Sequence, residues 1–374
     1  MKKNLLVIII IWIASCQQPE KPKRTGLQKQ DSYFKYARHV SVQTFDGFKL
    51  LHIIKAYPGA PDYKYVLKQK PARIPDSLSQ WPVIEVPVKT LVVTSTTHLP
   101  ALVMLHETGK LIGFPHTNYI SNTELRQRVA DGQITELGLG RRLNTEKLLA
   151  LHPDVLVCFS SGSDPNNDLF LQNKGIPVIY NADWMEQTPL GRAEWLKLFG
   201  LLFQKERAAD SIFNLIESRY NRIKRQIDST LPKPLIFQGG IFGDKWFVPG
   251  GKSYAAQLIK DAGGQYMWEE DQHTGSVTLN FENVFLKLPK ADIWLNPGLY
   301  HTKSEILNAL PAAKDLKTFK TGRIYTYSLT KGTGGGILYF EESNAHPDRV
   351  LSDLFQIFHP NQNKSKLYYY KVLP

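Results

Sequence analysis

Side chains able to bind a ligand gather in loops that directly follow apolar segments typical of buried strands. Flat aromatic walls suit the face of a planar ring system, and cations suit carboxylate or catecholate oxygens. Ligands of open α/β sheets bind where the strands end, so we expect these loops to form a pocket. The candidates are Thr97, His98, His116, Tyr119, Ser160, Phe242, Lys245, Trp246, Tyr300 and Lys331, each of which could instead be a packed loop residue.

The same loops give little support to direct metal binding or catalysis. His98 and His116 could ligate a metal, but no third convergent ligand is visible, so we predict no direct metal site and no cofactor. Gly-x-Ser-x-Gly and His-Glu-x-x-His are absent from the sequence. The segment GGKS at 250–253 resembles the end of a phosphate-binding loop. Such a loop requires a glycine at position 246, but this position is Trp246. We therefore predict that the chain is not an enzyme.

Residues 1–16 are typical of a lipoprotein signal peptide. Lys2 and Lys3 precede an apolar run at 5–13, which is too short to span a bilayer but suits the core of a signal peptide. The following Ile-Ala-Ser-Cys resembles the lipobox of bacterial lipoproteins. We expect Cys16 to carry the lipid that anchors the chain on the periplasmic side of a bacterial membrane. The alternatives are an ordinary cleaved signal peptide with an incidental cysteine, and an uncleaved anchor.

The charge of the chain is basic, with 46 Lys and Arg against 34 Asp and Glu, a formal net charge of +12. Such an excess is compatible with nucleic acid, a membrane surface or an anionic ligand. A location outside the cytoplasm makes nucleic acid an unexpected partner and removes ATP as a substrate. With Cys16 lipidated, Cys158 has no disulfide partner, and its apolar surroundings at 155–159 predict a buried strand residue.

The rest of the chain divides by composition and periodicity. Residues 17–32 are a polar tether, and 33–88 are a β-rich extension with many prolines. From Lys89 onward, short apolar strands alternate with helices, which predicts parallel sheets covered on both faces. We place one α/β lobe at 89–187 and a second at 231–374. The predicted fold class is α/β, with two Rossmann-like lobes after the β-rich extension.

A helical pattern at 188–230 separates the two lobes. Thr188 is a plausible N-cap, Pro189 fits the first helical position, and apolar residues recur at helical spacing up to Pro232. About 40 residues would give a helix of about 60 Å, which is long enough to bridge two lobes. The alternative is two helices broken near Gly200 or Gln204.

A short internal repeat relates the two lobes. Asn144, Glu146 and Pro153 recur with the same spacing as Asn280, Glu282 and Pro289. Each copy reads as a short helix followed by a strand, with apolar residues at matching positions. The repeat predicts two lobes of similar construction. The alternative is a chance match, because a helix followed by a proline and a strand is a common pattern in α/β proteins.

Three segments carry a resemblance to a known family: EKLLALHPD at 146–154, PGGKSYAAQLIKDAGG at 249–264 and PDRVLSDLFQIFHP at 347–360. With the lipobox and the helical linker, residues 89–360 resemble the helix-linked substrate-binding proteins of ABC importers for cobalamin and ferric siderophores. The resemblance implies a monomer that binds its ligand between two lobes. The implied ligand is a ferric siderophore, haem or cobalamin. The extension at 33–88 lies outside the usual pattern of that family.

The resemblance also implies partners. In that family one glutamate on each lobe docks into arginine clusters on the permease, and by motif position these are Glu146 and Glu282 here. The implied partners are the permease and ATPase subunits of an ABC importer. The alternative is that both glutamates are merely favoured near helix N-termini by the helix dipole. Two other functions stay open at this point: an extracytoplasmic hydrolase, and a surface scaffold that uses 33–88.

Overall fold

The computed structural model describes residues 33–139, 142–159, 165–227, 232–243, 245–362 and 366–374. The predicted signal peptide, the lipidation site Cys16, the tether and the candidate Ser160 lie outside these residues. Within them, no helix is both long enough and apolar enough to cross a membrane.

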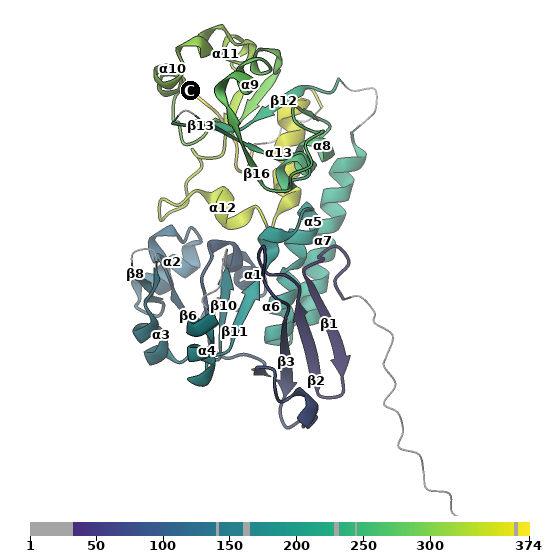
Figure 1. Ribbon diagram of the computed structural model, residues 1–374, viewed down its shortest axis with the longest axis vertical. Helices are drawn as coiled ribbons and strands as arrows, with labels where there is room; N and C mark the ends of the chain where they lie inside the picture. Colours follow the sequence, from purple (N-terminus) through teal and green to yellow (C-terminus); the bar gives the residue numbers. More distant parts are fainter. Residues whose placement is uncertain (1–32, 140–141, 160–164, 228–231, 244, 363–365) are drawn as a thin grey trace, which may run out of the picture. The chain divides into compact units, whose positions relative to one another are not determined.

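The extension at 33–88 forms a four-stranded sheet, as its composition predicts (Figure 1). Asp46 and Gly47 make the tight turn of its first hairpin, where Gly47 has a φ of 77° that favours glycine. Phe34, Leu51 and Tyr65 are buried in the same core as the strands of the first lobe. The extension is therefore part of that lobe rather than a separate module. Its strands are β1 (Val40–Phe45), β2 (Phe48–Ile53), β3 (Tyr63–Gln69) and β4 (Val83–Val86).

The first lobe contains a parallel five-stranded sheet in the order β11-β10-β5-β6-β7. All three residues of β5 are fully buried, as expected for a central strand covered on both faces. Cys158 in β10 is only partly buried. The strands are β5 (Leu91–Val93), β6 (Leu111–Phe114), β7 (Thr135–Glu136), β10 (Val155–Phe159) and β11 (Val178–Asn181), with a short β8 (Gly138–Leu139) and β9 (Arg142–Leu143) pair beside them. Its helices are α1 (Leu99–Met104), α2 (Thr123–Ala130), α3 (Thr145–Leu151) and α4 (Pro165–Asn173).

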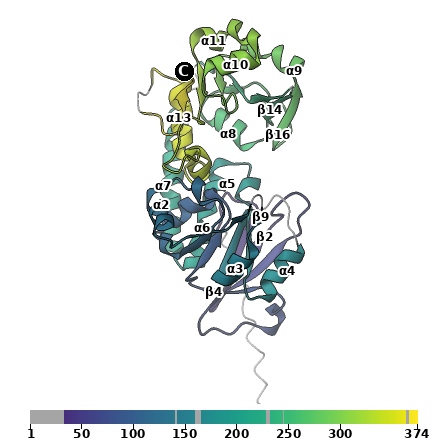
Figure 2. The same cartoon turned by 90° about the vertical axis from the view of Figure 1, so that its left-hand side faces the viewer.

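The second lobe repeats this design and adds a small antiparallel sheet (Figure 2). Its main sheet has the order β15-β12-β17-β18-β19, in which only β19 is antiparallel to its neighbour. These strands are β12 (Leu235–Gln238), β15 (Gln265–Tyr266), β17 (Ile293–Leu295), β18 (Ile324–Thr326) and β19 (Lys371–Val372). The small sheet contains β13 (Gly240–Phe242), β14 (Lys245–Pro249) and β16 (Ser276–Asn280). The helices are α8 (Tyr254–Asp261), α9 (Phe281–Phe285), α10 (Lys303–Ala309), α11 (Lys317–Thr321), α12 (Leu338–Glu342) and α13 (Pro347–Phe358).

The two copies of the repeat have the same local structure. Asn144 caps α3 by accepting a hydrogen bond from the backbone N–H of Lys147, and Asn280 caps α9 by accepting one from Asn283. After each helix an aspartate fixes the start of the first strand of its lobe: Asp154 accepts from the backbone of Lys89 and Thr90, and Asp292 accepts from Leu235. The repeat in the sequence is thus a repeat of the fold.

The prediction of one continuous helix over 188–230 is wrong, because the segment folds as α5 (Pro189–Glu194), α6 (Leu196–Phe203) and α7 (Glu206–Arg225). Gln204 adopts the left-handed conformation that ends α6, and α7 then packs back along α6. Gly200 permits this close packing, since a Cβ there would lie 2.6 Å from the Cβ of Ala209. The alternative of a break near Gln204 describes the structure.

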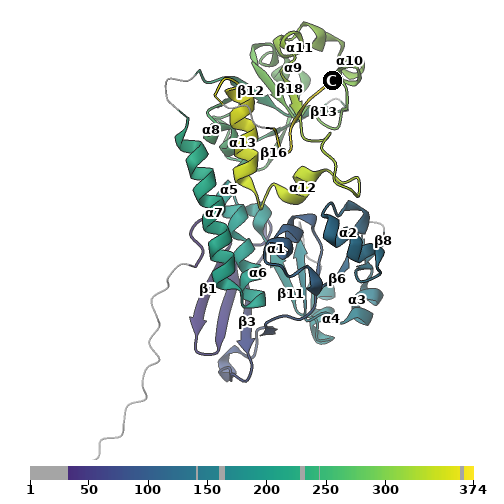
Figure 3. The same cartoon turned by 180° about the vertical axis from the view of Figure 1, so that it is seen from behind.

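Helix α7 links the cores of the two lobes. Its 20 residues span about 30 Å. Ala209, near its start, belongs to the core of the first lobe, whereas Phe213, Ile216 and Tyr220 belong to the core of the second. The helix packs on α6 and on α13, as Figures 1 and 3 show.

A second contact between the lobes involves Glu341 of α12. Its carboxylate accepts hydrogen bonds from the backbone N–H groups of Ser121, at 2.6 Å, and Asn122, at 3.0 Å, just before α2. Nearby, the Thr333 hydroxyl donates to the carbonyl of Ser121. Gly332 lies so close that a Cβ there would meet the Ser121 side chain at 2.2 Å. The lobes are therefore held by polar contacts as well as by α7.

This contact predicts a pH-dependent stability. Burial raises the pKa of Glu341 from 4.5 to about 7, although hydrogen bonds from Ser121 and Asn122 act in the opposite direction. The folded protein therefore holds the proton more tightly than the unfolded chain, and the stability that Glu341 contributes at pH 5 is lost as the pH rises through 7. Relative to Glu341→Gln, we expect the wild type to lose roughly 2–3 kcal/mol of unfolding free energy between pH 5 and pH 8. Urea unfolding of both proteins at each pH measures this difference, and parallel pH profiles would contradict it.

Candidate functional site

The second lobe contains a cavity of about 720 Å³. It lies at the carboxyl ends of β12 and β17, beside the small sheet. Aromatic side chains supply much of its wall: Phe242, Phe247, Tyr254, Tyr300 and Tyr327. The volume is typical of sites for small ligands or cofactors.

Strand alternation in β14 decides which aromatic side chains reach the cavity. Phe247 lines it, whereas the neighbouring Trp246 is fully buried on the opposite face, against Phe237 and Trp294. Trp246 is thus a core residue, and the prediction that it binds ligand is wrong because successive strand residues point to opposite faces. Lys245, on the same strand, is exposed and does not line the cavity.

Glycines allow two loops to meet at the floor of the cavity. The loop after β12 approaches the loop after β17 so closely that a Cβ on Gly240 would lie 2.7 Å from the backbone nitrogen of Gly298. Gly298 has a φ of 104°, a conformation that favours glycine. Between these loops, Asn296 donates a 3.4 Å hydrogen bond to the Tyr370 hydroxyl and accepts one from the backbone of Tyr327.

Arg192 is the only charged side chain among the described residues that line the cavity. It comes from α5, and its guanidinium lies 4.1 Å from the centre of the Tyr254 ring. It donates to the carbonyls of Trp184 and Glu186, both at 3.0 Å, and to the Asn344 side chain at 3.4 Å. Arg192 is therefore held in place before any ligand arrives.

Two tyrosines of the cavity wall, the buried Tyr254 and the partly buried Tyr327, stay protonated at physiological pH. Burial raises the pKa of Tyr254 to about 12, and the nearby Asp183 adds to this shift while Arg192 opposes it. Burial also raises the pKa of Tyr327 to about 12. Tyr327 stacks on Tyr339 with ring centres 4.1 Å apart, which fixes its orientation. The cavity thus offers neutral hydroxyl groups and flat rings.

Of the ten ligand candidates, the structure places Phe242 and Tyr300 in the cavity wall. The first-lobe candidates within the described residues do not line this cavity. Thr97 borders a separate space of about 20 Å³, enough for one water molecule. Lys331 is exposed, and its loop packs against the loop that holds Tyr119, where a Cβ on Gly336 would lie 2.6 Å from the Tyr119 carbonyl.

His116 belongs to a loop organised by Glu136. The Glu136 carboxylate accepts backbone hydrogen bonds from His116 and Thr117, both at 2.7 Å, and from Gly138 at 2.6 Å. Burial opposes ionisation of Glu136, but these bonds and the Thr117 hydroxyl outweigh it and lower the pKa of the carboxyl. Within the described residues, no group of three His, Cys, Asp or Glu side chains is placed to hold a metal ion.

His98 is a core residue rather than a cavity residue. It is fully buried near Phe199, and neither ring nitrogen has a hydrogen-bond partner. Burial lowers its pKa to about 3, so the ring is neutral. An unpartnered buried polar group costs stability, so we expect His98→Leu to raise the free energy of unfolding by about 1–3 kcal/mol and to leave ligand affinity unchanged. Chemical denaturation and a binding titration check both parts, and a loss of either stability or affinity would contradict this assignment.

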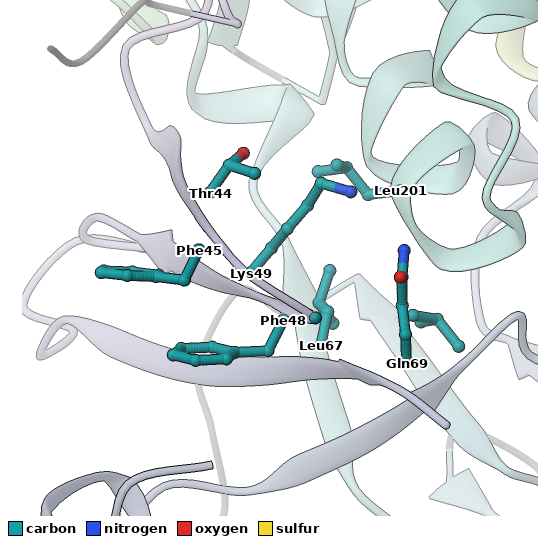
Figure 4. Close-up of a pocket in the computed structure, with 9 residues that line it drawn as sticks. Thr44, Phe45, Phe48, Lys49, Leu67, Gln69 and Leu201 are labelled. Atoms are coloured by element: carbon teal, nitrogen blue, oxygen red, sulfur yellow. The ribbon is translucent and has the colours of Figure 1, made fainter. Parts of the chain in front are cut away.

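A smaller cavity of about 90 Å³ lies between the extension and Leu201 of α6 (Figure 4). Phe45 and Phe48 stack at its edge, with ring centres 4.8 Å apart. Lys49, which reaches toward α6, pairs with Glu206 at 2.7 Å. This space is too small for the ligands that the sequence suggests, so the second-lobe cavity is the candidate site.

The chain is similar to known proteins in sequence and in fold. A family described as "Periplasmic binding protein" matches residues 91–328. An uncharacterized lipoprotein of Methanocaldococcus jannaschii is 24% identical over 339 residues, which cover 87% of this chain and 79% of the relative. A periplasmic heme-binding protein from Pseudomonas aeruginosa has a TM-score of 0.57 and 17% identity, over 76% of this chain and 97% of the other. The periplasmic vitamin B12 binding protein of Vibrio cholerae has a TM-score of 0.52 and 11% identity, over 74% and 99%.

Proposed function

Because the chain belongs to the periplasmic binding protein family, and is therefore a solute-binding protein rather than an enzyme, we propose that it delivers an iron complex or a corrinoid to an ABC importer. The ligand in this proposal is a ferric siderophore, haem or cobalamin. The chain carries it outside the cytoplasm, anchored through a lipid on Cys16. It acts as a monomer with the permease and ATPase subunits as partners.

The observation that carries this proposal is the aromatic cavity of the second lobe. Its size suits a ligand of several hundred Å³, and rings such as Phe247 and Tyr300 offer flat surfaces to a macrocycle or a catecholate. Solved proteins of the same fold bind heme and vitamin B12, which supports the same ligand class here. The extension at 33–88 is packed into the core of the first lobe, so nothing favours its use as a separate scaffold module.

A spectroscopic titration tests the ligand class. Haem, cyanocobalamin, a ferric trihydroxamate and a ferric tris-catecholate each absorb visible light, so each can be titrated with the purified chain and followed by its difference spectrum. We expect at least one of the four to bind at a single saturable site. If none of them binds, the proposed ligand class is wrong.

The proposed docking to the permease rests on Glu146 and Glu282. Both side chains are exposed, and each lies in the first turn of an asparagine-capped helix, one in each lobe. A carboxylate can form a bidentate pair with an arginine, so two of them on separate lobes would fix the orientation of the protein on a two-subunit permease.

A further inference from the structure

The charges around the second-lobe cavity limit which ligand it can take. The sequence places two lysines and two histidines among the candidate loops, which favours an anionic ligand. In the structure none of these four side chains lines the cavity, and Arg192 is the only charged group among the described residues that do. No carboxylate among those residues faces the cavity either.

Much of the hydrogen-bonding capacity of Arg192 is already used. A guanidinium has five N–H donors, and three of its hydrogen bonds here go to Trp184, Glu186 and Asn344. The Asn344 side chain that Arg192 contacts also donates a 3.2 Å hydrogen bond to the buried Asp183, whose pKa is raised by burial although Arg192 opposes that shift. About two donors remain for a ligand, which is enough for one anionic group.

The other polar groups of the wall are neutral. Tyr254, Tyr327, Asn296 and Ser253 offer hydroxyl and amide groups that can hydrogen-bond to a ligand but cannot neutralise its charge. Burying an unpaired charge in such a site costs several kcal/mol. Each negative charge of the ligand beyond the first would therefore have to remain in water at the mouth of the cavity.

We propose that this site selects a ligand with a flat or macrocyclic face that buries at most one negative charge, and that Arg192 receives that charge. This inference rests on the proposed function and narrows its ligand class. It favours cobalamin or an uncharged ferric trihydroxamate, whose anionic oxygens are neutralised by the iron. It disfavours a multiply anionic ferric tris-catecholate.

The test measures the affinity of cyanocobalamin, a ferric trihydroxamate and a ferric tris-catecholate for the wild type and for two variants. Arg192→Met removes the cation of the cavity. Lys320→Met is the matched control, because it removes an exposed cation of α11, in the same lobe, that does not line the cavity. For the wild type, we expect cyanocobalamin or the trihydroxamate to bind at least about tenfold more tightly than the tris-catecholate. Arg192→Met should weaken this preferred ligand by roughly tenfold or more, the loss expected for one hydrogen bond to a charged group, and Lys320→Met should not.

Three results would overturn the inference. The first is tightest binding of the tris-catecholate by the wild type, and the second is an equal effect of the two substitutions. If Arg192→Met fails to fold, the affinity of the wild type at low and high salt replaces it. The third overturning result would be a preferred ligand whose affinity falls steeply as the salt concentration rises, because such a dependence indicates several ion pairs. Binding of none of the probes would instead overturn the proposed function, and this inference with it.

Discussion

Replacing Glu146 and Glu282 together by alanine is expected to abolish importer-dependent uptake while leaving ligand affinity unchanged. The expectation follows from their positions, since each is exposed in the first turn of a short helix and neither borders the second-lobe cavity. Removing a charged group from a docked pair leaves its partner unpaired, which costs about 2–5 kcal/mol at each end. Each single variant should therefore reduce uptake strongly, and the double variant should reach background.

The measurement is uptake of a radiolabelled ligand by cells or proteoliposomes that contain the cognate importer, together with a binding titration of each variant. Glu305→Ala is a suitable control, because Glu305 is also an exposed glutamate in the first turn of a helix of the second lobe. If the two glutamates serve only the helix dipole, the double variant would lose about 1 kcal/mol of stability and import normally. Normal uptake, or a loss of ligand affinity, would exclude the docking role.

Replacing Phe242 and Phe247 together by alanine is expected to weaken ligand binding by about a hundredfold. Both side chains line the cavity and are more than a third exposed, so they are available to a ligand while contributing little to the core. Stacking of a flat ligand on an aromatic side chain contributes about 1–3 kcal/mol per ring, and an intermediate value of about 1.4 kcal/mol for each of the two rings corresponds to about tenfold each. The variant should fold normally.

Phe281→Ala provides the matched control for this pair. Phe281 is 38% exposed, close to the 42% of Phe247, and it lies in the same lobe, where it stacks on Phe285 outside the cavity. Titration of the wild type, the double variant and this control with the tightest probe measures the effect. An unchanged affinity in the double variant, or an equal loss in the control, would place the ligand elsewhere.

The general fold could be predicted because its signals are local. Apolar strands alternating with helices indicate parallel sheets, and the spacing of Asn144, Glu146 and Pro153 indicates a capped helix before a strand. The continuity of the linker could not be predicted in the same way. The helical periodicity passes through Gln204 without a proline, and only the packing of Gly200 against Ala209 shows that the chain reverses there.

The cavity was harder to predict because it depends on register and on distant segments. The dipeptide Gly243-Asp244 indicates a hairpin turn. Because successive strand residues point to opposite faces, this turn would have placed Phe247 on the same face as Phe242 and Trp246 on the opposite face. Arg192 and Tyr327 carry no such signal. They reach the cavity only because α5 and the end of β18 are brought beside it by the tertiary structure.

We propose the aromatic cavity of the second lobe as the binding site of an iron complex or a corrinoid. Equilibrium titration of the wild type and of the Phe242→Ala, Phe247→Ala double variant, with the same four coloured probes, tests it most directly. We expect one saturable site in the wild type for at least one probe, and an affinity about a hundredfold lower in the double variant. Absence of binding by the wild type, or equal binding by both proteins, would contradict it.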